Sequence, residues 1–202
     1  MEKTRFNSLA VGLCAVGLST GILSVAKADT IAFTPPVLNS FGDEPTGNDG
    51  EFFTPTTSIW VTALGYINPG SSVGNEVGLY DVSTTTLLAS AMITSSSMAA
   101  GGFLYEPIAP VLLTAGNEYA VAGLYTAGDG ALGYTADSGI GAATEITFDG
   151  YEYDSSSSLD LPTIPYATPI FGPNFQYVSA PEPRTMTIII AGAFLLLVRR
   201  QR

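Results

Sequence analysis

The central part of this 202-residue chain lacks every basic side chain and every cysteine. Between Ala28 and Arg184 there is no Lys, Arg, His or Cys, yet this stretch carries all the acidic residues except Glu2 and Glu182. Without His and Cys, a zinc site of the usual ligands, a histidine-based catalytic triad and thiol chemistry are excluded. Without Lys and Arg, nucleic acid is excluded as a partner, because no side chain can neutralise its phosphates.

The basic residues gather at the two ends, and the N-terminal ones indicate a signal peptide over residues 1–28. A short basic region precedes the mostly apolar residues 9–25, and Ala26 and Ala28 then form the small-x-small cleavage pattern, so Asp29 is expected to begin the mature chain. The alternative is an uncleaved anchor, since this run approaches the ~20 residues of a membrane span. Cys14 would leave with the segment, so the mature protein would have no disulfide.

The last 22 residues, 181–202, combine a short motif, an apolar run and a basic end. The apolar run covers residues 185–198, and as a helix it would be about 21 Å long, short of a ~30 Å hydrocarbon core. The arginines that follow it would face the cytoplasm and place the acidic body outside. This pattern predicts a short C-terminal transmembrane helix.

The order of these features resembles the PEP-CTERM sorting signal of certain Gram-negative bacteria. The matching residues are Pro181, Glu182 and Pro183, then the apolar run, then Arg199 and Arg200. The resemblance implies an exosortase-like sorting enzyme as partner and export across the inner membrane to the cell surface or extracellular matrix. It also implies a link with exopolysaccharide and biofilm. The basic residue directly after the motif departs from the family pattern, so both cleavage of the tail and its retention as an anchor remain open.

Residues 29–180 are expected to form one all-β domain, an antiparallel β-sandwich or jelly roll. No stretch has sustained helical periodicity, and short runs of β-branched and aromatic residues alternate with turn residues such as Ala115-Gly116-Asn117 and Asp149-Gly150. The predicted strands are Ser58–Ile67, Glu76–Asp81, Thr86–Thr94, Gly102–Ile108, Glu118–Tyr125 and Asn174–Val178. Residues 154–173, rich in serine and proline, predict a long surface excursion.

The stretch from Phe52 to Tyr125 also resembles a β-rich domain of uncharacterised function that is often found in PEP-CTERM proteins. The similarity lies in the segments TPTTSIWVTALGYI, NEVGLYD, TLLASA and GGFLYEPIAPVLLTAGNEYAVAGLY. It implies a β fold and carries no activity or site residues.

An acidic, turn-rich segment over residues 41–50 is the best candidate for a metal site. The spacing fits no EF-hand, so the alternatives are a flexible Ca²⁺ loop and a solvated acidic loop. The candidate oxygen ligands are Asp43, Glu44, Asn48, Asp49 and Glu51. With so many acids, weak divalent binding across the surface is also expected.

Other candidate sites are weaker, and no enzyme activity is predicted. The GxGxxG match over residues 128–133 has no helix after it and contains an acid that would repel phosphate. Two carboxylates suffice for a glycosidase, but sixteen acids in the body make a chance pair inevitable. A sugar-stacking platform could form from tyrosines that are more typical of a core edge. These tyrosines are Tyr66, Tyr80, Tyr105, Tyr119 and Tyr125.

The sequence therefore predicts an exported surface or matrix protein with a structural or adhesive role. The alternatives are a calcium-assisted carbohydrate-binding module and, third, a carboxylate-only glycoside hydrolase.

Overall fold

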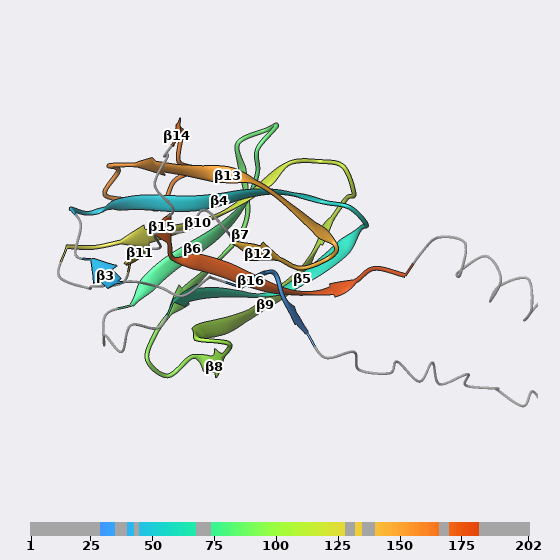
Figure 1. Cartoon of the computed structure of the whole chain (residues 1–202), viewed down its shortest axis with the longest axis horizontal. Coiled ribbons are helices and arrows are strands. Elements are labelled where there is room, and N and C mark those ends of the chain that lie inside the picture. The colour runs from blue at the N-terminus through green and yellow to red at the C-terminus, as the bar shows by residue number, and fades with distance from the viewer. Residues whose placement is uncertain are drawn as a thin grey trace, which may run out of the picture.

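Antiparallel strands make up the regular structure of the protein in a computed structural model, and two larger sheets pack face to face (Figure 1). The structure describes residues 29–34, 40–42, 45–67, 74–127, 132–134, 140–165 and 170–181. Within these ranges there is no helix, and hence none long and apolar enough to cross a membrane. The all-β prediction is confirmed. The predicted signal peptide and C-terminal helix lie outside the described residues.

The first large sheet has six strands in the order β14-β13-β4-β10-β6-β7. Its bounds are β4 Gly47–Pro55, β6 Asn75–Asp81, β7 Thr86–Ile93, β10 Tyr119–Tyr125, β13 Ile146–Asp154 and β14 Ile164–Pro165. The second has five strands in the order β1-β16-β5-β9-β8. Its bounds are β1 Thr30–Ile31, β5 Ile59–Ile67, β8 Met98–Ala100, β9 Phe103–Leu113 and β16 Pro173–Ser179.

Two small sheets complete the described structure. One has the order β15-β11-β3 and the other pairs β12 with β2. Their bounds are β2 Phe33–Thr34, β3 Ser40–Gly42, β11 Leu132–Tyr134, β12 Gly141–Ala142 and β15 Ile170–Phe171.

Aromatic side chains from both large sheets and from β2 form the centre of the core. The rings of Phe53 on β4 and Phe175 on β16 lie 4.7 Å apart, and Phe33 packs edge-on against both at 5.9 and 5.7 Å. All three are fully buried. With no disulfide to constrain the chain, such ring contacts and the apolar area they bury hold the sheets together.

The six predicted strands are confirmed as β5, β6, β7, β9, β10 and β16, with β9 several residues longer than expected. Two long strands, β4 and β13, were not predicted. Residues 47–50 belong to β4, so the prediction of a loop over residues 41–50 is wrong there. The predicted turn at Asp149-Gly150 is instead a bulge inside β13, where Gly150 has a φ of 155° and the register with β4 shifts.

The two ends of the described chain lie side by side. Strand β1 pairs with β16, and Thr30 is opposite Tyr177. Strand β16 runs from Pro173 to Ser179, so its first residue is about 20 Å away from its last, which lies near this end. In Figure 1 both ends of the described chain lie on one side of the molecule.

Candidate functional site

Strand β4 places two carboxylates between the two large sheets. Side chains alternate along a strand, so Asp49 and Glu51 share the inward face with Phe53 of the aromatic core. Asp49 is 3% exposed and Glu51 is 1% exposed. The two acids are thus interior groups of a strand, and the prediction that they belong to a flexible loop is wrong.

Asp49 contacts the opposite sheet through a tyrosine. The hydroxyl of Tyr66 on β5 donates a hydrogen bond to Asp49 Oδ1 at 3.3 Å, and both groups are buried. Glycine at position 123, which is opposite Asp49 on β10, makes room for this tyrosine, because a Cβ there would collide with the Tyr66 ring. A Cβ at Gly172 would likewise collide with the Asp49 carboxylate and lie 2.6 Å from the Tyr66 hydroxyl. Both glycines are therefore required by close approach.

Glu51 has no hydrogen-bond partner at either carboxylate oxygen. Burial raises the pKa of this carboxyl well above its usual value, and the nearby charge of Asp49 raises it further. The N–H groups of Gly172 and of Glu51 itself lower the pKa in part, although neither completes a hydrogen bond of good geometry. The folded chain therefore favours a neutralised Glu51.

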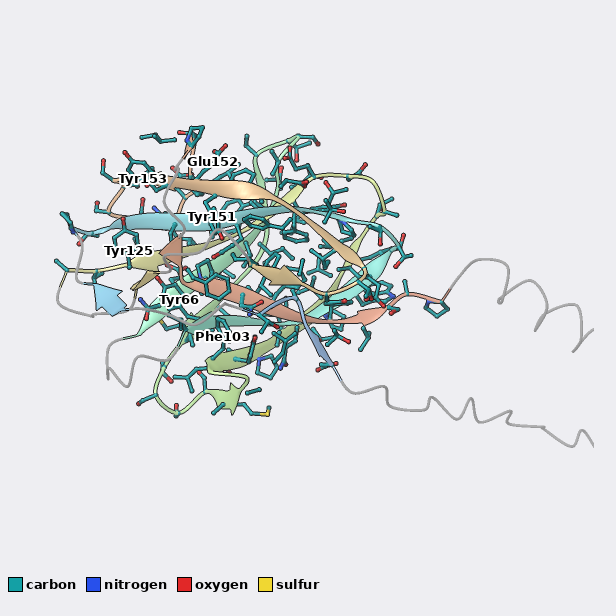
Figure 2. The ribbon with its side chains drawn as sticks, in the orientation of Figure 1. Tyr66, Phe103, Tyr125, Tyr151, Glu152 and Tyr153 are labelled. Atoms are coloured by element: carbon teal, nitrogen blue, oxygen red, sulfur yellow. The ribbon has the colours of Figure 1, made fainter. Side chains whose placement is uncertain are left out.

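A second tyrosine faces Glu51 from the neighbouring strand of the same sheet. Tyr151 on β13 is directly opposite Glu51, so the two side chains lie on one face. The Tyr151 hydroxyl oxygen is buried without a partner, and burial followed by the charge of Glu51 raises the pKa of this tyrosine. Figure 2 shows Tyr66, Tyr125, Tyr151 and Tyr153 in the half of the molecule away from the two ends of the described chain.

Asn48 points to the opposite side of β4 and has a structural role. Its Nδ2 donates to Asp154 Oδ1 at 3.0 Å and to the Ser158 carbonyl at 2.9 Å, while its Oδ1 accepts the Asp160 N–H at 3.2 Å. These bonds fix residues 155–161 over the outer face of the six-stranded sheet, where Leu161 joins a small apolar cluster. Asn48 therefore does not share a site with Asp49 and Glu51.

The structure settles the position of some predicted site residues and not of others. Of the candidate calcium ligands, Asp43 and Glu44 lie outside the described residues. All five candidate sugar-stacking tyrosines are buried, between 1% and 6% exposed, which confirms the core-edge interpretation. Among the targeting residues, Asp29 and Pro181 are the first and last described, while Ala26, Ala28, Glu182, Pro183, Arg199 and Arg200 lie outside. Tyr151 and Gly172 were missed, because only the fold brings them to the acids.

The two buried carboxylates can balance the charge of a small cation, but they are not accessible to a polymer. The described part of the chain contains no Lys, Arg or His, so no ion pair forms within it and no basic side chain there can balance the charge of the two acids. Nor does any group of three or more His, Cys, Asp or Glu gather there as a ready-made metal cluster. Since Asp49 and Glu51 are almost fully buried, a glycan cannot contact them in this structure.

No protein-family model matches this chain, and no curated protein matches it either.

Proposed function

We propose that this chain is an exported β-sandwich protein of the cell surface or extracellular matrix with a structural or adhesive role. In this proposal, residues 1–28 direct export and the tail with Pro181, Glu182 and Pro183 is handled by an exosortase-like enzyme. The protein is expected to lie in a matrix that contains exopolysaccharide. The ectodomain is proposed to serve this structural or adhesive role through its fold and its acidic surface, and not to catalyse a reaction.

The position of the two ends of the described chain supports this proposal. Because Thr30 pairs with Tyr177, the segment that leads from the signal peptide and the one that leads to the tail meet at one end of the sheets. A tether at that end leaves the rest of the domain exposed to a matrix. The carbohydrate-binding alternative loses its tyrosine platform, since those five rings are buried.

Fractionation of the native host tests this proposal. An epitope tag is placed after Arg202 and detected with one antibody, and a different antibody detects the β domain. In a host with the sorting enzyme, we expect the domain in the surface and matrix fraction, separated from the epitope. Alanine at Pro181, Glu182 and Pro183 should leave domain and epitope together in the inner membrane.

Matrix cohesion in a deletion strain provides the functional readout. Complementation with the wild-type gene should restore it, and complementation with the triple-alanine variant should not. Domain found in the cytoplasm, or equal cohesion with and without the gene, would contradict the proposal. Release of reducing sugar from matrix polysaccharide would support the hydrolase alternative instead.

A further inference from the structure

We propose that Asp49 and Glu51, together with the hydroxyls of Tyr66 and Tyr151, bind one divalent cation of the calcium type between the two sheets. This site differs from the predicted acidic loop, because it is internal and excludes Asn48. The inference concerns the folded domain itself and is independent of how the protein is sorted.

The unpartnered carboxylate of Glu51 is the observation that carries this proposal. It is 1% exposed, and neither of its oxygens has a hydrogen-bond partner. An uncompensated buried charge is strongly unfavourable, so such groups are paired, protonated or bound to a metal. No basic residue exists anywhere between Ala28 and Arg184. Within residues 29–183, therefore, only a proton or a cation from solvent can neutralise the two acids, and a divalent ion balances two carboxylates where a monovalent ion balances one.

The donor atoms match the chemistry of calcium. Two carboxylates supply four oxygens and the hydroxyls of Tyr66 and Tyr151 supply two more, which reaches the lower limit of the 6–8 oxygens that Ca²⁺ takes. Nitrogen and sulfur ligands, which zinc prefers, are absent from these four side chains. Mg²⁺ retains several waters when it binds, so it fits a buried site less well than Ca²⁺.

The backbone approaches the two acids closely, and only glycine fits at position 172. Gly172 lies so close that a Cβ would collide with the Asp49 carboxylate, and its N–H is directed toward Glu51. Gly172 also fixes the end of β5, because its carbonyl accepts the Ile67 N–H at 2.8 Å. The buried Tyr151 hydroxyl, which also lacks a partner, lies on the face of Glu51. Strands from both sheets thus direct oxygen atoms toward one region.

The test compares matched carboxylate-to-amide variants of the full chain, purified in a non-ionic detergent. Glu51→Gln removes the buried charge, and Glu118→Gln removes an exposed one with the same change of charge and shape. Unfolding is followed by the fluorescence of Trp60, the only tryptophan. Each protein is melted with chelator, with CaCl₂ and with MgCl₂, all at one ionic strength.

We expect Ca²⁺ at 100 times its Kd to raise the Tm of wild type and of Glu118→Gln by about 5–10 °C. Glu51→Gln should not respond, and with chelator it should melt at a higher temperature than wild type. Terbium, used as a calcium probe, should luminesce on excitation of the tyrosines in wild type and Glu118→Gln, and much less in Glu51→Gln. Asp49→Asn provides a second variant should Glu51→Gln fail to fold, with the same loss expected.

Two results would overturn the proposal. An equal calcium response in all variants would show that the ion acts only on the surface. A wild-type Tm that ignores calcium but falls as the pH rises, with no such fall in Glu51→Gln, would show that a proton neutralises the pair.

Discussion

Removal of the Asn48 side chain should loosen the segment that covers the outer face of the six-stranded sheet. Asn48 is fully buried and makes three hydrogen bonds to residues 154–160. In Asn48→Ala the Ser158 carbonyl and the Asp160 N–H lose their partners in a partly buried place. At about 1 kcal/mol for each bond, with more for the bond to the Asp154 carboxylate, the loss is about 3–4 kcal/mol.

Urea unfolding of the full chain, followed by Trp60 fluorescence, measures this loss. Asn117→Ala is the matched control, because it changes an exposed asparagine and should stay within about 0.5 kcal/mol of wild type. Hydrogen exchange gives the local readout: the Asp160 amide should lose protection before the amides of β4 do. A change in stability below 0.5 kcal/mol, or unchanged protection at Asp160, would refute the role assigned to Asn48.

Two further predictions concern the buried acids. Gly172→Ala should destabilise the chain by about 1–3 kcal/mol in urea unfolding, because its Cβ would collide with Asp49 and crowd Tyr66; a variant as stable as wild type would contradict this close approach. With chelator present, stability should fall as the pH rises above about 4.5, the ordinary pKa of Glu51, because the folded state keeps a proton that the unfolded state releases. The measurement is the urea midpoint at several pH values, and Glu51→Gln should show a smaller slope.

The strands that the sequence predicted well are those whose burial comes from apolar side chains. Residues 59–67 of β5 are almost continuously apolar, and turn residues on either side confine the run. Strand β10 is similar, since both of its faces are covered and neither requires a polar alternation. In these cases burial follows from composition, so a local pattern suffices.

Strand β4 was missed because its first residues have the composition of a turn. The segment Gly47–Pro55 begins with Gly, Asn, Asp and Gly, and its inward positions are acids where a strand ordinarily has apolar residues. The spacing of Asp49, Glu51 and Phe53 was nevertheless a signal, since all three recur with a period of two. No local pattern could show that Tyr66, Tyr151 and Gly172 are neighbours of Asp49 and Glu51, because each comes from a different strand or loop.

Neither the surface carboxylates nor the buried carboxylates of this domain have basic residues to balance them, but the two groups respond differently to cations. Surface carboxylates repel one another over distances that salt screens, with a Debye length of about 10 Å at 0.1 M, so any salt relieves them. Asp49 and Glu51 are buried away from solvent. Dissolved salt screens buried charges only weakly, so a bound proton or ion is needed to balance the charge of these two acids. Sodium chloride at matched ionic strength should therefore reproduce the surface effect of calcium and leave the interior unchanged. The difference between calcium and sodium, measured in wild type and then in Glu51→Gln, isolates the contribution of the buried pair.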